Sequence, residues 1–420
     1  MTDELWSYKE LIKADDGPLI RVYETLASLE SIGRAARARL SPKARVIAVT
    51  GSVGKTTTKE MLRFALASQG VTHASTKSYN NLWGVPLSLA RMPIDTRYAV
   101  FEIGMNHSGE ITPLTKMVQP HVAIVTTVEA VHLENFRSVS EIADAKAEIF
   151  SGLDEKGSAI INLDNPHWAR LYRSAKNHNV HVVGVTKEMS AAEAVRSCVV
   201  EKATSLKTLQ MESAKSLLSV EQSDAQGEVQ FELGAPGIHL ATNALFVVAA
   251  LREVGADVQR GVRELHFFAP PEGRGTRTKL KIDAGELLLI DESYNANPAS
   301  MRAALSVVSA ISRQDHPRRI AVLGDMLELG DKAAKFHEDL WEAVDEAGVD
   351  LVFAAGRNMF HLIQRLPKNR VGAWAQTSKE LEGKLLEVLK PGDVVMIKGS
   401  NSSQMGLLTE SILNKFKKLY

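Results

Sequence analysis

One short segment constrains the fold of this 420-residue chain most: a glycine-rich turn between an apolar run and a helical pattern. The turn reads Thr50-Gly51-Ser52-Val53-Gly54-Lys55-Thr56-Thr57-Thr58, and the β-branched run at 46–50 leads into it. In this context glycines let backbone N–H groups point at an anion, and the N-terminus of the following helix adds partial positive charge. Lys55 can reach the β- and γ-phosphates of a nucleotide, while the Thr56 hydroxyl can bind Mg²⁺. We therefore expect a nucleotide site made by Gly51, Ser52, Gly54, Lys55, Thr56 and Thr57.

The loop departs from the general phosphate-loop pattern at one position. That pattern has a glycine where this chain has Val49, so the loop is a shortened variant. A Gly-Ser turn that only caps a helix is the simpler alternative. The preceding buried strand and the helix predicted over 56–68 supply the context that a phosphate loop requires, and they favour nucleotide binding.

Composition narrows the classes of partner. Lys plus Arg and Asp plus Glu are equal at 50 each, so no global field attracts nucleic acid or an anionic membrane. The single cysteine, Cys198, excludes an intrachain disulfide and fits a reducing compartment. The N-terminal residues lack a signal-peptide pattern, and no apolar run is long enough to span a bilayer. We expect a cytoplasmic protein, acting as a monomer, that neither binds nucleic acid nor inserts into a membrane.

The periodicity of the chain predicts two α/β units. In the first, predicted strands alternate with helices, which is typical of a mainly parallel sheet; the strands are at 46–50, 98–103, 121–128, 158–164 and 180–185. Near the end of this unit Val229, Phe231 and Leu233 alternate with polar residues, which predicts a half-buried strand in an antiparallel patch. A helix is then predicted over 242–254.

A break at 268–273, which contains two prolines, marks a domain boundary. After it the alternation restarts, with strands predicted at 287–291, 319–323, 351–355 and 394–397, and helices at 298–312 and 378–389. We predict an α/β protein. Its central phosphate-loop ATPase domain, with a mainly parallel sheet, spans 46–269. A smaller, dinucleotide-fold-like C-terminal domain spans 270–420, and residues 1–45 are mostly helical.

Two polar side chains follow predicted strands of the first unit. Glu102 ends one strand, and His132 lies just beyond another. Ligands of open α/β sheets bind outside the carboxyl ends of the strands. Taken alone, a glutamate there is usually solvated and a histidine is usually a satisfied loop residue. Together with the glycine-rich loop, they predict a metal–nucleotide site.

The ordered series of motifs resembles the Mur ligase family over about residues 18–400, and within it the members that add D-alanyl-D-alanine. Beyond the phosphate loop, the matching runs are residues 79–86, 102–106, 132–134, 145–150, 273–275, 291–298, 323–330 and 398–400, together with His239 and Asn243. Two of these runs, Tyr-Asn-Ala-Asn-Pro at 294–298 and Gly-Asp-Met-Leu-Glu-Leu-Gly at 324–330, point to the D-alanyl-D-alanine-adding members.

The resemblance implies an activity and its cofactors. It implies an ATP-dependent ligase that adds D-alanyl-D-alanine to UDP-N-acetylmuramoyl-tripeptide through an acyl phosphate, in peptidoglycan precursor synthesis. ATP and two Mg²⁺ ions are the implied cofactors. A carbamylated Lys146 is also implied, although the sequence alone favours an exposed lysine on an amphipathic helix. Other amide ligases of the Mur or folyl-polyglutamate type, or a degenerate non-catalytic paralogue, are the alternatives.

The resemblance also implies residue roles. The implied catalytic residues are Lys55, His132 and Lys146. The implied metal ligands are Thr56, Glu102, His132 and Lys146. Contacts to the nucleotide are implied for Asn243, Arg274 and Asp291, and contacts to the other substrates for Asn80, Asn81, Asn295 and Asn297.

The chain departs from the family in two places. The usual Gly-Asp-Leu-Phe and Asp-Gly-His signatures of the uridine-binding domain are missing, and residues 18–45 resemble only the last strand and helix of that domain. We therefore expect residues 1–45 to be a remnant of this domain, with weak binding of the UDP moiety. Asn401 stands where an arginine is more usual, so one positive charge facing the substrate is expected to be absent.

Overall fold

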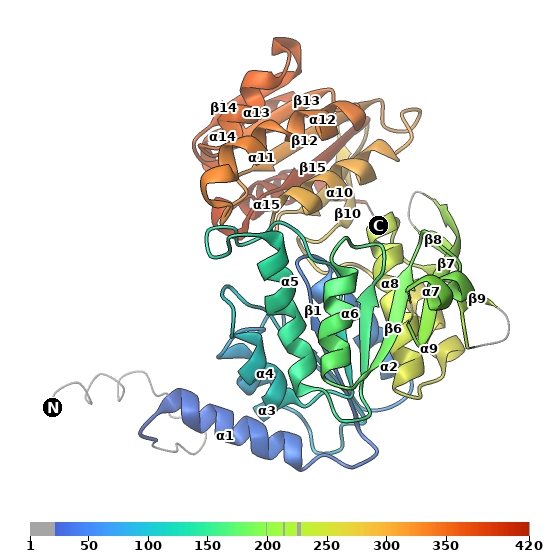
Figure 1. Cartoon of the computed structure of the whole chain (residues 1–420). Coiled ribbons are helices and arrows are strands. Elements are labelled where there is room, and N and C mark those ends of the chain that lie inside the picture. Colours follow the sequence, from blue (N-terminus) through green and yellow to red (C-terminus); the bar gives the residue numbers. More distant parts are fainter. Residues whose placement is uncertain (1–21, 199, 213–214, 225–227, 420) are drawn as a thin grey trace, which may run out of the picture.

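Two β-sheets, each with helices on both faces, organise the chain (Figure 1). The structure is a computed structural model, and it describes residues 22–198, 200–212, 215–224 and 228–419. Residues 1–21, part of the predicted uridine-domain remnant, lie outside these ranges.

The first sheet has nine strands in the order β2-β3-β1-β4-β5-β6-β7-β8-β9. Its strands are β1 Arg45–Thr50, β2 Thr72–Ala74, β3 Tyr98–Glu102, β4 Val122–Val125, β5 Ser158–Asn162, β6 His181–Thr186, β7 Lys202–Met211, β8 Ser216–Gln222 and β9 Glu228–Leu233. Neighbours from β2 to β7 are parallel, and β7, β8 and β9 are antiparallel. The parallel sheet and the antiparallel patch of the sequence analysis are both confirmed.

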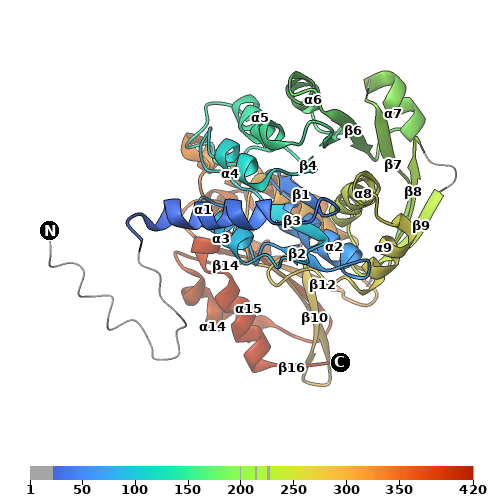
Figure 2. The same ribbon diagram turned by 90° about the horizontal axis from the view of Figure 1, so that it is seen from below.

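Helices cover both faces of this sheet. They are α1 Thr25–Ala38, α2 Lys55–Ala67, α3 Gly84–Ala90, α4 Ile111–Val118, α5 Val139–Ala147, α6 Trp168–Asn177, α7 Ala191–Cys198, α8 Ile238–Glu253 and α9 Val258–Glu264. Successive β1 residues point to opposite faces, so Val46 and Ala48 pack into the core under α3–α7, while Ile47 and Val49 pack into the core under α2, α8 and α9. A strand buried on both faces explains the continuous apolar run before the glycine-rich loop. Figure 2 shows α1 lying along α3.

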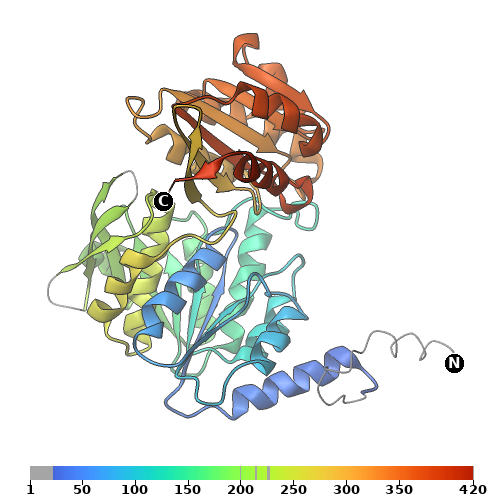
Figure 3. The same cartoon turned by 180° about the vertical axis from the view of Figure 1, so that it is seen from behind.

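The second sheet has seven strands in the order β14-β13-β12-β15-β11-β10-β16. They are β10 Thr276–Ile282, β11 Gly285–Glu292, β12 Arg318–Gly324, β13 Leu351–Ala355, β14 Val371–Ala375, β15 Asp393–Lys398 and β16 Lys417–Lys418. The flanking helices are α10 Pro298–Ser309, α11 Ala333–Glu338, α12 Leu340–Glu346, α13 Met359–Arg365, α14 Ser378–Val388 and α15 Gly406–Lys415. Figure 3 shows β10 and β16 along one edge of this sheet. The predicted α/β class is thereby confirmed for both units, whereas the exact domain limits stay a prediction.

Several predicted boundaries need correction. The strand predicted at 121–128 ends at Val125, because Thr126 turns its hydroxyl to the carbonyl of Val53 at 2.5 Å. The helix predicted over 242–254 begins earlier, at Ile238. The strands β2, β10, β14 and β16 were not predicted, since β2, β14 and β16 are short and β10 carries alternating charged residues. None of the helices in the described ranges is long and apolar enough to cross a lipid bilayer.

One buried ion pair fixes the register between β12 and β15. Arg318 donates to both carboxylate oxygens of Asp393 at 2.7 and 2.6 Å, and Asp393 also accepts the backbone N–H of Lys390. Asp393 is fully buried. The pair therefore differs in environment from the exposed Arg170–Asp144 pair of the first domain, in which the shortest distance is 2.8 Å.

Asp393→Asn should destabilise the C-terminal domain by about 3–5 kcal/mol, because the change leaves a half-buried guanidinium without its counter-charge. The matched change Asp144→Asn should cost under about 1 kcal/mol, because water screens the exposed pair. Hydrogen exchange of the β12 and β15 amides measures the first loss, and exchange of the α5 and α6 amides measures the second. Equal effects of the two changes would contradict the assignment of Asp393 as a buried anchor.

Candidate active site

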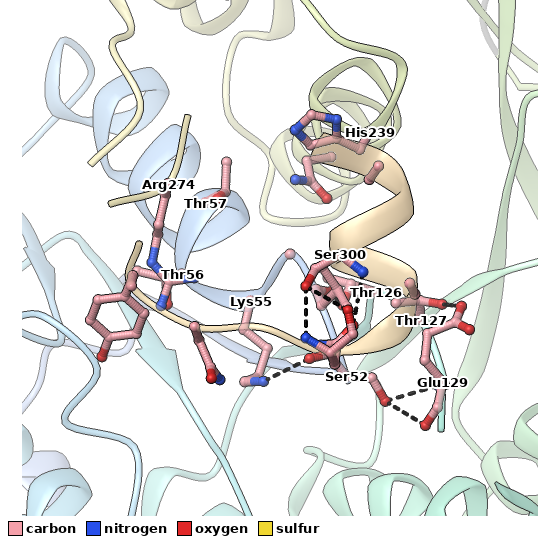
Figure 4. Close-up of a pocket in the computed structure, with 18 of the residues that line it drawn as sticks. Ser52, Lys55, Thr56, Thr57, Thr126, Thr127, Glu129, His239, Arg274 and Ser300 are labelled. Atoms are coloured by element: carbon pink, nitrogen blue, oxygen red, sulfur yellow. Dashed lines mark hydrogen bonds between the residues drawn. The ribbon is translucent and has the colours of Figure 1, made fainter. Parts of the chain in front are cut away.

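A cavity of about 580 Å³ lies between the carboxyl ends of the first sheet's strands and the C-terminal domain (Figure 4). Its floor comes from the glycine-rich loop and the start of α2. Polar residues beyond β3 and β4 form one wall, and α8 contributes another. The C-terminal domain closes it with the turn before β10, the segment after β11 and the start of α10. Segments of both domains that are far apart in the sequence therefore meet at one place.

The glycine-rich loop has the geometry expected of a phosphate site. Gly51 and Gly54 have positive φ values of 147° and 88°, and a Cβ on either residue would meet Thr126 or Asn243 at 1.9 and 2.6 Å. Gly54 is the N-cap of α2, and no side chain of the described residues accepts the first N–H groups of this helix. Those groups are therefore free to bind an anion. Lys55 Nζ lies over the loop and donates to the Gly51 carbonyl at 2.6 Å.

Glu102 is buried beside this loop with two donors. Thr56 donates its hydroxyl to Oε2 at 2.8 Å, and Asn80 donates its amide to Oε1 at 2.7 Å. Glu102 is 1% exposed, so the solvated glutamate considered in the sequence analysis is not what the structure shows. The predicted metal ligands Thr56 and Glu102 thus lie side by side, with the predicted substrate residue Asn80 on the same carboxylate.

Lys146 is a buried lysine without an ion-pair partner. It lies in the last turn of α5, is 2% exposed and makes no hydrogen bond or ion pair within the described residues. Burial lowers the pKa of Lys146 well below its ordinary value, and the positive charge of Lys55 lowers it further. Its amine is therefore biased toward the neutral form. The alternative of an exposed lysine on an amphipathic helix is wrong.

The positive charges of the cavity oppose one another. Burial lowers the pKa of Lys55, Glu102 counteracts the shift, and the guanidinium of Arg274 lowers the pKa further. Arg274 comes from the C-terminal domain, and Figure 4 shows it above Thr56 and Lys55. Each of these two positive charges disfavours the other, and the negative charges of a bound polyphosphate would offset the repulsion between them.

The donor set fits a magnesium ion held together with a nucleotide. No group of three or more His, Cys, Asp or Glu side chains in metal-binding arrangement occurs among the described residues. Mg²⁺ usually takes only one or two protein oxygens and completes its octahedron with phosphate oxygens and water. Thr56 and Glu102 supply such a pair of oxygens. His132 also lines the cavity, and its Nδ1 contacts the carboxylate of Glu328 from the C-terminal domain.

The α8 wall brings His239 and Asn243 into the same cavity. Burial lowers the pKa of His239, which favours the neutral imidazole. Its Nδ1 is buried and lacks a hydrogen-bond partner within the described residues. Asn243 lies against Gly54. These two polar edges can hydrogen-bond a heterocyclic base attached to the phosphates.

A clasp between the domains was not predicted from the sequence. Tyr294 donates its hydroxyl to Ser78 Oγ at 2.7 Å, and Arg274 lies over the Tyr294 ring at 4.1 Å from the centroid. Arg274 also donates to Ser78 Oγ at 3.4 Å. Ser78, Arg274 and Tyr294 each lie in or beside one of the family's motif runs, and this was the only sign in the sequence that they could be functional. Contact across about two hundred residues leaves no trace in local periodicity.

Not every predicted site residue reaches the cavity. Asn295 and Asn297 line it, although Asn297 Oδ1 also accepts the Ser300 N–H in the capping box of α10. Asn81 instead accepts the N–H groups that begin α3. Asp291 holds the turn that carries Arg274 by accepting the Gly273 N–H at 3.1 Å. Asn81, Asp291 and Gly51 do not line the cavity, although the Gly51 carbonyl accepts from Lys55 Nζ.

Lys59 is a buried positioning residue that the sequence analysis missed. It follows Lys55 by one helical turn and is fully buried. Its ammonium donates to the carbonyls of Ser75 and Lys77 at 2.7 Å each and pairs with Glu60 at 2.8 Å. It thereby anchors the loop that carries Ser78 and Asn80 to the phosphate-loop helix.

Lys59→Met should release this loop, since both carbonyls lose their shared donor. Trypsin cleavage after Lys77, which is exposed, should speed up by about tenfold or more, because the site must unfold locally to be cut. Lys116→Met, on the exposed face of α4, serves as the control and should leave the rate unchanged. An unchanged rate in Lys59→Met would rule out the anchoring role.

Comparison with known proteins agrees with this geometry. The Mur ligase middle domain matches residues 49–251, and the glutamate ligase domain of Mur ligases matches residues 276–401. The chain is 34% identical over 371 residues to the UDP-N-acetylmuramoyl-tripeptide--D-alanyl-D-alanine ligase of Escherichia coli (strain K12). The aligned residues make up 88% of this chain and 77% of that protein. The protein of the same name from Rickettsia prowazekii is 30% identical over 94% of this chain and 84% of its own length. The crystal structure of MurF from Acinetobacter baumannii superposes with a TM-score of 0.81 at 29% identity, covering 94% of this chain and 82% of that chain. The chain therefore belongs to the Mur ligase family.

Proposed function

We propose that this chain is an ATP-dependent ligase that joins UDP-N-acetylmuramoyl-tripeptide to D-alanyl-D-alanine in peptidoglycan precursor synthesis. The relatives of similar length are named for this activity. The observation that carries the proposal is the uncapped N-terminus of α2, with Lys55 over it and the Thr56–Glu102 pair beside it. All of these residues come from one chain, so a monomer suffices, and the cytoplasm is where its nucleotide-linked substrates are available.

The reaction needs an activated carboxylate. A free carboxylate is a poor acyl donor because oxide would have to leave. Transfer of the γ-phosphoryl group of ATP to a carboxylate oxygen gives an acyl phosphate and ADP. The amine of the dipeptide then attacks the acyl carbon and loses a proton, and the tetrahedral intermediate collapses with release of phosphate.

The phosphoryl transfer depends on charge placed around the nucleotide. The N–H groups at the start of α2 bind phosphate oxygens, and the Lys55 ammonium moves from the Gly51 carbonyl to the β- and γ-phosphates. Arg274 contributes a further positive charge from the C-terminal domain. Mg²⁺ held by Thr56 and Glu102 supplies neutralisation of the transferred group when it is bound.

Lys146 acts as a carbamate. Its neutral amine attacks CO₂ and the adduct loses one proton to water, so that the side chain becomes an anionic carbamate with oxygen donors. This removes the like-charge conflict with Lys55 and creates, with His132, the donors of a second Mg²⁺ ion.

The clasp between Ser78, Tyr294 and Arg274 protects the acyl phosphate from water by holding the C-terminal domain against the loop. Asn80, Asn295 and Asn297 line the same cavity and offer amide groups to the peptide substrates. The convergence of Lys55, Thr56, Glu102, His132 and Lys146 on this cavity favours an enzyme over a non-catalytic paralogue.

Lys55→Ala should lower phosphate release that depends on both peptide substrates by about 10²-fold or more, because a positioned charge in the transition state is lost. A coupled phosphate assay with ATP, the tripeptide precursor and D-alanyl-D-alanine measures this. Lys116→Ala is the control for loss of a lysine and should retain activity. Near-normal turnover by Lys55→Ala would contradict the phosphate-loop assignment.

Lys146→Ala should lose activity and regain part of it with formate or acetate, because a small carboxylate can occupy the place of the carbamate. Wild-type activity should fall in CO₂-free buffer. It should also fall as the pH drops through the lowered pKa of Lys146, since a protonated amine cannot form the carbamate. Lys146→Arg keeps a positive charge and should stay inactive. Full activity of Lys146→Arg would exclude the carbamate.

A further inference from the structure

Two loops, one from each domain, meet beside the predicted metal ligand His132. The carboxylate of Glu328, which lies after β12, contacts Nδ1 of His132. The backbone of the same two segments is joined as well, because the Glu134 N–H donates to the Glu328 carbonyl at 3.4 Å. The contact thus involves both the side chain and the main chain of Glu328.

The backbone on both sides of this contact is held in an unusual conformation. His132 and Glu328 have positive φ values of 54° and 62°, which residues other than glycine seldom adopt. Gly330, with a φ of 57°, packs against Glu134: an added Cβ would stand at van der Waals contact, 3.5 Å from the Glu134 Cα. Such conformations persist only where the surrounding structure enforces them, and they cluster at functional sites.

The segment that carries Glu328 is anchored on either side. The Met326 N–H donates to Nε2 of buried His337 at 2.9 Å, and Leu329 is buried in the C-terminal core. The side chain of Glu328 itself is 45% exposed. The side chain of Glu328 can therefore be substituted without opening the core.

We propose that Glu328 is a positioning residue that orients His132 for the metal only when the C-terminal domain is docked. A histidine that binds a metal through one ring nitrogen usually donates the other to a carboxylate, which fixes its tautomer and its orientation. Here the carboxylate in contact with Nδ1 comes from the other domain, and the contact lacks hydrogen-bond geometry in this structure. Once Nδ1 donates to that carboxylate, domain docking and completion of the metal site become one event. The inference rests on the proposed function, in which His132 binds Mg²⁺.

The ordinary alternative is a half-exposed ion pair of little consequence. The two differ in what happens to metal binding. If Glu328 acts through His132, its removal weakens the metal site, and this effect disappears once His132 is gone. If it is only a surface contact, metal binding does not change.

The test uses Mn²⁺ as the probe, titrated by electron paramagnetic resonance into the full chain with a non-hydrolysable ATP analogue. Glu328→Gln should weaken Mn²⁺ binding by about tenfold or more, as loss of an outer-shell partner typically does. Glu342→Gln, at an exposed site of the same domain, is the control and should change it by less than about twofold. In a His132→Gln background, Glu328→Gln should have no further effect.

Unchanged Mn²⁺ affinity in Glu328→Gln would overturn the inference. So would an equal loss with and without His132, because the effect would then be structural. Failure of the wild-type chain to bind the analogue with Mn²⁺ would contradict the proposed function, and the inference with it. Normal wild-type binding with an unaffected Glu328→Gln variant would reject this inference alone.

Discussion

The uncapped N-terminus of α2 is the feature on which the rest of the structure depends. Backbone N–H groups at a helix start must find acceptors, and Gly54 offers no side chain to satisfy them. The fold keeps this opening rigid by burying β1 between two cores, one on each face of the sheet. Lys55 and the Thr56–Glu102 pair are then fixed relative to the opening, since they belong to α2 and to the neighbouring strand β3.

Two buried lysines show how the same side chain serves different purposes. Lys59 has three acceptors, and its charge ties the loop at 75–78 to the phosphate-loop helix. Lys146 is equally inaccessible but has no acceptor within the described residues, and its pKa is lowered by burial and by Lys55. A satisfied buried charge stabilises a conformation, whereas an unsatisfied one is driven toward the neutral, nucleophilic form. This contrast separates a structural lysine from a reactive one on physical grounds.

The sequence predicted the features that arise from local patterns. The run at 46–50, the glycine-rich loop and α2 follow from periodicity and loop chemistry, and Glu102 follows from its place at a strand end. The contacts made by Ser78 and Glu328 could not be predicted, because their partners Tyr294 and His132 lie about two hundred residues away along the chain. The burial of Lys146 was missed for a related reason: α5 carries both polar and apolar residues, and only the packed fold shows which face is covered. Asn81 and Asp291 were expected at the cavity because motif membership cannot distinguish a ligand contact from a side chain that caps a helix or holds a turn.

The central claim is that ATP bound at this loop activates a carboxylate of the peptide precursor. The most direct measurement follows an isotope rather than a rate. With the tripeptide precursor labelled with ¹⁸O in its reacting carboxylate, mass spectrometry of the released phosphate reports which oxygen was phosphorylated. We predict one labelled oxygen in each phosphate formed together with the amide product. Unlabelled phosphate accompanying that product would show that no acyl phosphate forms and would contradict the account.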